Sequence, residues 1–177
     1  MKNTFLQIVL CNGISVKMTI NFKRLYLLKE KNEDLYRLFF VSLNNAYIDV
    51  LELLNIAYVA YLIANIDDFE KCYSHKDFLK LFPVENLKKI YQLIEPKSNN
   101  SFRKAFSRKM SGKGGKQTIP KFELEDVEDF YSYFVLISKI SENLFWNADY
   151  AFLLSVLENK TTFDEYMNKV REGQIKK

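Results

Sequence analysis

The sequence contains little cysteine, glycine and proline. Its two cysteines, Cys11 and Cys72, are too few for a disulfide framework, and their spacing matches no zinc or redox motif. We therefore expect two free thiols in a reducing compartment, each packing as a small apolar group. Five glycines and three prolines among 177 residues, with 48% hydrophobic residues, exclude collagen-like and low-complexity chains. The composition indicates a globular protein that buries a core.

Histidine is scarcer still. The single histidine, His75, stands beside Ser74 and Asp77 at an expected helix start, where adjacency on one turn does not assemble a catalytic triad. No second histidine or cysteine provides metal-ligand spacing, and residues 112–116 (Gly-Lys-Gly-Gly-Lys) lack the spacing of a phosphate-binding loop. We predict that the protein is not an enzyme, with no catalytic residue, metal site or cofactor. His75 is then expected to be a solvated residue of a first helical turn.

Long apolar runs are also missing. Asp49, Glu52 and Asn55 interrupt the most apolar stretch, residues 47–66, and the uninterrupted part is too short to cross a bilayer. Gln7 interrupts the apolar run after Met1, and no small-residue cleavage site follows it. We therefore expect neither a membrane span nor export.

The net charge of +4 is unevenly distributed along the chain. Residues 1–95 are nearly neutral, residues 96–121 carry eight basic and no acidic residues, and residues 122–158 carry one basic and eight acidic residues. The basic segment has a proline at both ends and three of the five glycines, which is typical of a flexible linker. These boundaries predict three parts: a domain at 1–95, a linker at 96–121 and a small domain at 122–177.

The first domain is expected to open with a β-hairpin and to continue as a helical bundle. Asn12-Gly13 predicts a type I′ turn, followed by an alternating strand whose buried face carries Ile14, Val16, Met18 and Ile20. From residue 22 the apolar period becomes helical. Expected helices follow Asn32, Asp49 and Ser74 as N-terminal caps, and residues 49–65 are apolar on most sides, as in the centre of a bundle.

Helices are also predicted for the small C-terminal domain. We expect one from about residue 123 to 140, one over 148–158 capped by Asn147, and one starting at the capping box of residues 162–165. Eight aromatic residues fall within 23 positions, too many for a core of fewer than sixty residues to bury alone. The fold class is therefore mainly α, with a hairpin, a bundle, a linker and a helical module.

Several segments together resemble the tail assembly chaperones of long-tailed phages. The resemblance rests on a hairpin leading into residues 20–23 (Ile-Asn-Phe-Lys), the apolar helix at 50–62, and residues 145–154 (Phe-Trp-Asn-Ala-Asp-Tyr-Ala-Phe-Leu-Leu). The last segment is similar to the extension that this family adds by a programmed ribosomal frameshift. Gly112-Lys113 and Gly115-Lys116 stand where such a slippery site is expected.

The resemblance implies a non-enzymatic chaperone of virion morphogenesis in the host cytoplasm, absent from the mature virion. The first domain would bind and solubilise the tape measure protein, the extension would recruit the tail tube protein, and self-association into oligomers would be expected. In the extension, the candidate contacts with partners are Phe145, Trp146, Tyr150 and Phe152, of which at least half are expected to pack in the core.

The basic linker supports an alternative. Eight positive charges with interleaved phenylalanines could contact phosphates, which would make the protein a nucleic-acid-associated phage regulator. The candidate contacts are Arg103, Lys104, Arg108 and Lys109. The competing interpretation of the basic segment is that it is a soluble tether between two modules, or that it folds against the acidic segment beside it.

Overall fold

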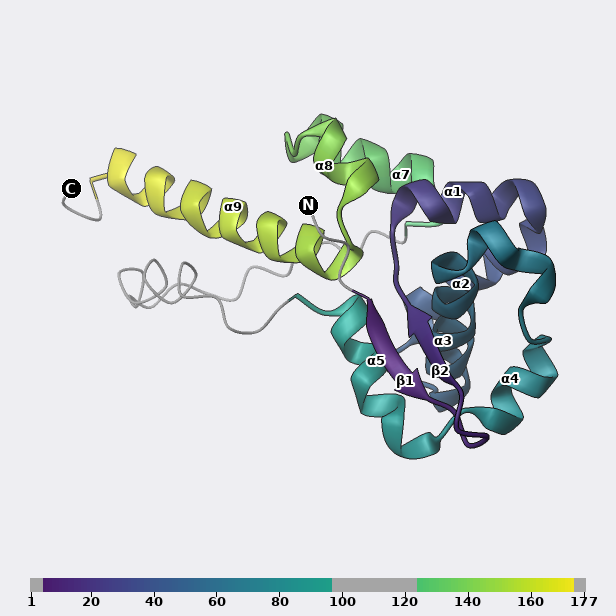
Figure 1. Ribbon diagram of the computed structural model, residues 1–177. Coiled ribbons are helices and arrows are strands. Elements are labelled where there is room, and N and C mark those ends of the chain that lie inside the picture. Colours follow the sequence, from purple (N-terminus) through teal and green to yellow (C-terminus); the bar gives the residue numbers. More distant parts are fainter. Residues whose placement is uncertain (1–4, 97–123, 174–177) are drawn as a thin grey trace.

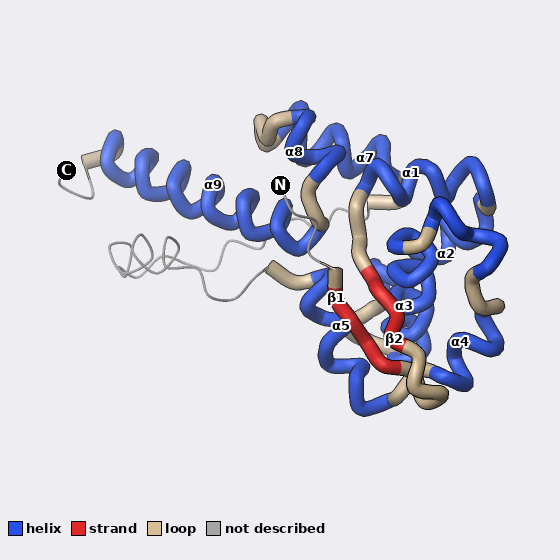
Figure 2. Tube along the Cα trace, viewed as in Figure 1, coloured by secondary structure: helices blue, strands red, loops and turns tan. Residues whose placement is uncertain are grey.

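The computed structural model describes residues 5–96 and 124–173. The predicted linker lies outside the described residues except for Pro96. In the described part, a two-stranded hairpin is followed by helices, and a helical C-terminal part completes the chain (Figures 1 and 2). The predicted mainly α fold is confirmed.

The hairpin pairs β1 (Leu6–Val9) with β2 (Ser15–Met18) in antiparallel register, so that Leu6 lies opposite Met18. Because side chains alternate across a strand, one face is buried and the other is exposed. The buried face consists of Ile8, Leu10, Val16 and Met18.

The turn of the hairpin differs from the predicted type I′ turn. Gly13 is left-handed with φ 83°, but among the described non-glycine residues only Lys139 has a positive φ, so Asn12 does not. The amide of Leu10 donates to the carbonyl of Ile14 at 2.9 Å, and the amide of Gly13 donates to the carbonyl of Leu10 at 2.8 Å. This is a three-residue loop, a type I turn followed by a left-handed glycine. The type I′ prediction was wrong, and Ile14, at the end of the loop, is 49% exposed rather than buried.

Two polar residues after β2 are buried although the alternation placed them on the solvent side. Thr19 and Asn21 lie where the chain passes from the strand into the first helix. The amide of Thr19 donates to the carbonyl of Ala60 at 3.1 Å, and Asn21 caps the helix by accepting from the amide of Arg24 at 3.2 Å. Residues 19–21, which connect β2 to the first helix, are therefore buried on both sides.

Seven helical segments follow in the N-terminal part. They are α1 (Phe22–Lys31), α2 (Glu33–Asn45), α3 (Val50–Ala64), η1 (Ile66–Lys71), α4 (His75–Leu81), η2 (Val84–Asn86) and α5 (Leu87–Ile94). The side chains of Asn32, Asp49 and Ser74 accept hydrogen bonds from the amides of the first turns of α2, α3 and α4. Each satisfies an amide that the helix itself leaves unpaired, which confirms these three predicted starts.

The C-terminal part departs further from the sequence prediction. It consists of α7 (Val127–Tyr131), the π-helical segment η4 (Ser132–Ile137), α8 (Glu142–Asn147) and α9 (Tyr150–Arg171). Asp149 rather than Asn147 caps α9, since its side chain accepts from the amide of Phe152 at 2.8 Å. The predicted new helix at Thr162 was also wrong. The Thr162 hydroxyl donates to the carbonyl of Glu158 at 2.8 Å within one continuous helix, so it does not cap a new one.

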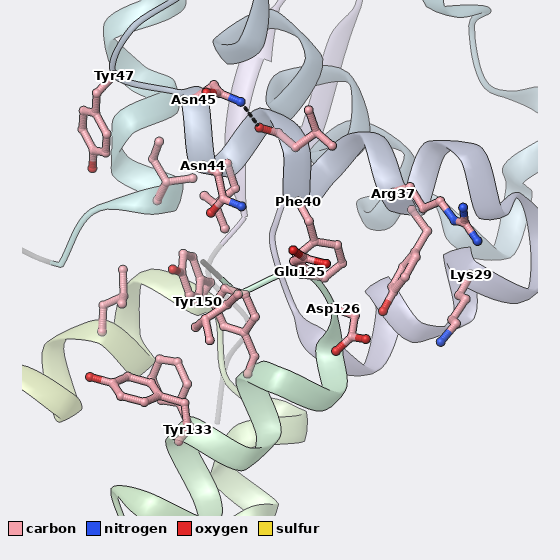
Figure 3. A pocket seen from close by; sticks show the side chains of 18 of the residues that line it. Lys29, Arg37, Phe40, Asn44, Asn45, Tyr47, Glu125, Asp126, Tyr133 and Tyr150 are labelled. Carbon is pink, nitrogen blue, oxygen red and sulfur yellow. Dashed lines mark hydrogen bonds between the residues drawn. The ribbon is translucent and has the colours of Figure 1, made fainter. Parts of the chain in front are cut away.

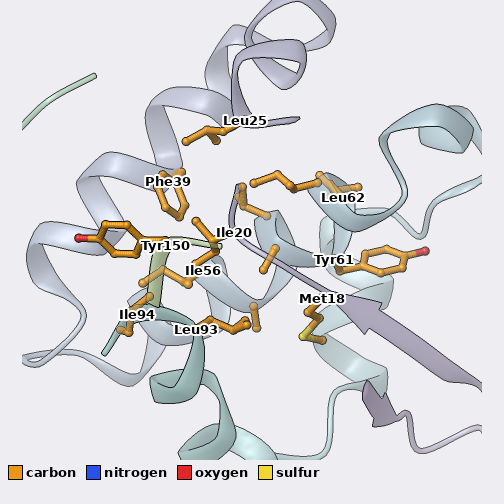
Figure 4. Packing of buried hydrophobic residues seen from close by; sticks show 14 of the residues in the cluster. Met18, Ile20, Leu25, Phe39, Ile56, Tyr61, Leu62, Leu93, Ile94 and Tyr150 are labelled. Atoms are coloured by element: carbon orange, nitrogen blue, oxygen red, sulfur yellow. The ribbon is translucent and has the colours of Figure 1, made fainter. Parts of the chain in front are cut away.

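Helix α3 lies at the centre of the N-terminal part, behind the hairpin in Figure 1, with α1, α2, α4 and α5 packed around it. Ten of its fifteen residues are buried, as predicted for a central helix. Helices α7 and α8 lie beside α1, and α9 runs outward from the rest of the described fold. Tyr150 of α9 belongs to the same buried cluster as Phe39 of α2 and Ile56 of α3 (Figure 4).

The predicted domain boundaries stay predictions, but the aromatic surplus has an explanation. Phe130, Phe134, Phe145 and Tyr150 are buried in a cluster that also contains Phe22 of α1. The C-terminal rings are therefore covered by the N-terminal helices.

Candidate functional site

A groove of about 1150 Å³ runs between the N-terminal helices and the C-terminal segment (Figure 3). One wall is α2 with the connection that follows it, and another is the start of the C-terminal segment with α7 and η4. The remainder comes from α9, the end of α5 and Lys29 of α1. Most of the lining is apolar or aromatic. Its rings belong to Tyr36, Phe40, Tyr47, Phe130, Tyr133, Phe134 and Tyr150.

Local sequence places these rings. Asn32 starts α2, and the helical period then puts Tyr36 and Phe40 on one face, where their rings meet edge to face at 5.0 Å. Phe40 also contacts Phe130 of α7 at 5.7 Å between ring centroids. The floor of the groove is thus made by contact between α2 and α7.

Several hydrogen bonds lie at the α7 end of the groove. The Tyr36 hydroxyl accepts from the amide of Val127 at 3.0 Å, which satisfies the first amide of α7. The Lys29 ammonium donates to Glu128 at 3.2 Å, and this hydrogen bond raises the pKa of Lys29. Burial raises the pKa of Tyr36. At this end of the groove, hydrogen bonds join α7 to α1 and to α2.

The opposite end is formed by the connection between α2 and α3. Tyr47 and Ile48 line the groove there and are 65% and 84% exposed. The Tyr47 ring stacks on Tyr91 of α5 at 5.7 Å. Val41, Val50 and Leu51 are exposed around the same connection. We call these five exposed apolar residues (Val41, Tyr47, Ile48, Val50 and Leu51) the corner patch.

The two carboxylates beside the corner patch, Asp49 and Glu52, are engaged in hydrogen bonds within the protein. The Asp49 carboxylate accepts from the amide of Leu51 at 2.8 Å as the cap of α3. Glu52 accepts from the buried Ser42 hydroxyl at 2.6 Å and from the Asn55 amide at 3.2 Å. Large apolar residues that are exposed close together around one connection are typical of an interaction surface.

His75 is not the solvated residue that the sequence predicted. It is half-buried, its Nε2 lies 3.0 Å from the Asn55 Oδ1, and its ring lies 4.8 Å from that of Tyr58. The histidine therefore helps to hold α4 against α3. The Ser42 hydroxyl, three hydrogen bonds away along the same network through Asn55 and Glu52, belongs to a fully buried side chain.

The predicted contacts of the extension divide into two pairs. Phe145 and Tyr150 are buried, and burial raises the pKa of Tyr150. Trp146 and Phe152 are partly buried. Two of the four therefore pack in the core. The predicted nucleic-acid contacts Arg103, Lys104, Arg108 and Lys109 lie outside the described residues.

Sequence reasoning did not identify the groove or the corner patch. A signal was present, because Tyr47 and Ile48 are apolar yet stand between the helix break at Asn44-Asn45 and the cap Asp49. Apolar residues in a short connection between two helices are either buried by a distant element or left for a partner. That distinction depends on the tertiary structure.

The side chains that line the groove are mainly apolar and aromatic, with lysine, arginine, aspartate, glutamate and asparagine among the polar ones. Among the described residues that line it there is no serine, threonine, cysteine or histidine. The described residues also contain no group of three or more histidine, cysteine, aspartate or glutamate side chains placed to hold a metal ion. No helix within residues 5–96 and 124–173 is long and apolar enough to cross a membrane.

Comparison of the chain with protein-family models, with curated proteins and with solved structures finds no match.

Proposed function

We propose that this protein is a non-enzymatic binding protein that takes the apolar face of a partner helix into its groove. The observation that carries the proposal is that Val41, Tyr47 and Ile48 of the corner patch also line the aromatic groove. Together the groove and the corner patch offer one apolar surface from Phe130 to Ile48. An amphipathic helix that is laid into a hydrophobic groove buries its apolar face in this way.

The size of the groove favours a polypeptide partner. Pockets for small molecules measure roughly 300–1,000 Å³ and enclose most of their ligand. The groove has about 1150 Å³ and opens onto the exposed side chains of Tyr47 and Ile48. It can therefore accept several side chains of one helix while the opposite face of that helix stays in water.

The partner that we propose is the tape measure protein of a long-tailed phage, with this chain as its assembly chaperone in the host cytoplasm. A long helical protein exposes apolar stripes before it is packaged, and reversible coverage of these stripes would keep it soluble. Recruitment of the tail tube protein would use the partly buried rings of Trp146 and Phe152. Phe145 and Tyr150 are covered while the C-terminal segment is packed on α1.

Co-expression with a tape measure protein tests the proposal. The wild-type chain should keep that protein in the soluble fraction and co-purify with it. Ile48→Lys should remove most of this effect, because it places a charge in the exposed corner patch without disturbing the core. Val9→Lys is the matched control, since Val9 is exposed on the outer face of β1, away from the groove.

Two results would contradict the proposal. One is a tape measure protein that stays insoluble with the wild-type chain. The other is equal loss of co-purification with Ile48→Lys and Val9→Lys, which would indicate a general effect of added charge rather than a binding surface.

A further inference from the structure

The N-terminal and C-terminal parts depend on one another unequally. In residues 5–96, the hairpin and α1, α2, α4 and α5 surround α3 and bury it. In residues 124–153, the buried rings of Phe130, Phe134 and Phe145 all lie against Phe22 of α1. The C-terminal segment thus obtains its core from the N-terminal part, in the manner of a ligand that folds onto a surface.

Phe22 is the centre of this contact. Its ring stacks on Phe145 at 4.5 Å with an interplanar angle of 11°, and it lies 5.2 Å from Phe130. The Tyr150 ring meets it edge to face at 5.7 Å. Stacked and edge-to-face arrangements at these distances add to the free energy of burial and also fix orientation.

Hydrogen bonds fix the register of the segment. The Asn21 Nδ2 donates to the carbonyl of Ala148 at 3.0 Å, and the Tyr150 amide donates to the carbonyl of Ile20 at 2.9 Å. The amide of Val127 donates to the Tyr36 hydroxyl at 3.0 Å. Three backbone groups of the segment are therefore paired with groups of residues 20–36. A surface that pairs backbone groups in this way recognises a particular chain conformation as well as its rings.

We propose that Phe22, with Ile20, Asn21 and Tyr36, forms a docking surface for residues 124–153 that also accepts this segment from a second copy of the chain. The ring contacts of Phe22 and the three hydrogen bonds can form equally well when the surface and the segment belong to different copies. Covalent connection supplies proximity, which favours the segment of the same chain over that of another copy. The segment of the same chain therefore holds the surface until it is weakened or displaced, and the exchange then joins two copies.

This inference does not depend on the identity of the partner in the groove, but it has a consequence for the groove. Phe130, Phe134 and Tyr150 line it and arrive with the docked segment. A chain whose own segment has been displaced completes its groove with the segment of another copy.

Complementation between two defective full-length chains tests the exchange. The donor carries Phe22→Ala, which damages its surface and leaves its segment intact. The acceptor carries Phe130→Ala and Phe145→Ala, which damage its segment and leave its surface intact. Trp146 is the only tryptophan of the chain and lies 6.3 Å from the ring of Tyr26 on α1, so its emission reports docking. The acceptor also carries Trp146→Phe, which removes its tryptophan, so that all tryptophan emission comes from the donor.

Mixing should shift the donor emission to the blue as acceptor is added, with saturation, and light scattering should give a mixed species of twice the mass of either chain. A control acceptor that also carries Phe22→Ala should give neither change. Circular dichroism of each chain checks its helix content. Phe22→Leu, which keeps an apolar side chain but removes the ring, serves as donor if Phe22→Ala lowers the helix content.

The proposal is overturned if the emission and mass stay those of the separate chains up to about 1 mM acceptor, which is on the order of the highest effective concentration that a tether can supply. It is also overturned if the control acceptor produces the same shift as the acceptor with an intact surface.

Discussion

At the scale of single residues, Thr19 is buried without a partner for its hydroxyl among the described residues. Its side chain is 1% exposed between β2 and α3, and its Oγ1 makes no hydrogen bond there. A buried polar group that lacks a partner retains its desolvation cost, and an apolar group of the same shape removes that cost.

We therefore expect Thr19→Val to raise the free energy of unfolding by about 1 kcal/mol in urea denaturation. The control is Thr161→Val, which changes an exposed threonine of α9 and should stay within about 0.5 kcal/mol of the wild type. A loss of stability on Thr19→Val would show that the hydroxyl is satisfied, for example by a buried water molecule.

The buried phenol of Tyr61 couples stability to alkaline pH. Burial raises the pKa of Tyr61 from 10.0 to about 12. Between these values the unfolded chain releases the proton while the folded chain keeps it, so stability is complete below pH 10 and declines as the pH rises towards 12. Urea denaturation at pH 9 and pH 11 should show this decline, and Tyr61→Phe should make it smaller. Equal declines in the two proteins would contradict the assignment to Tyr61.

At the scale of elements, α9 shows how context overrides a local signal. Residues 162–165 (Thr-Phe-Asp-Glu) have the pattern of a capping box, yet Thr162 lies inside a 22-residue helix. A threonine inside a helix can satisfy its hydroxyl on the carbonyl four residues earlier, as Thr162 does with Glu158. The same side chain therefore serves in either structure, and the sequence pattern alone does not distinguish them.

Proline at position 163 separates the two structures. If a helix began after a Thr162 cap, proline would be accommodated in its first turn. In the interior of a continuous helix it removes a hydrogen bond and costs about 3 kcal/mol. In a continuous helix, residues 159–162 have helical NMR shifts in the wild type. We expect Phe163→Pro to abolish these shifts, because proline disrupts the turn that precedes it, whereas Phe163→Ala should preserve them. Non-helical shifts of residues 159–162 in the wild-type chain would favour the two-helix interpretation.

At the scale of the whole molecule, packing around Phe22 joins residues that are more than 100 positions apart. Phe22 is buried among Phe130, Phe145 and Tyr150. Truncation of a buried phenylalanine to alanine leaves a cavity and typically costs about 3–5 kcal/mol.

Phe22→Ala should lower the free energy of unfolding by about this amount and shift the Trp146 emission to the red, because the segment that carries Trp146 loses its main contact. Leu27→Ala on the same helix is the control, since Leu27 is partly exposed and contributes less burial. A Phe22→Ala chain with unchanged stability and emission would show that the two parts do not depend on this ring.

The sequence by itself determined the local features of the fold. Asn32, Asp49 and Ser74 start their helices as predicted, and the alternation of β2 and the apolar character of α3 predicted a half-buried hairpin and a central helix. These features depend on groups a few residues apart, so their physical causes can be read from a short stretch of chain.

Only the tertiary structure decided where the aromatic residues of the C-terminal part go and where an apolar surface remains. Phe145 and Tyr150 are buried because α1 presents Phe22 to them, while Ile48 is exposed and Tyr47 is covered only where its ring stacks on Tyr91. Both outcomes depend on elements far apart in the sequence. Burial is a property of the assembled core, which local periodicity and composition do not specify.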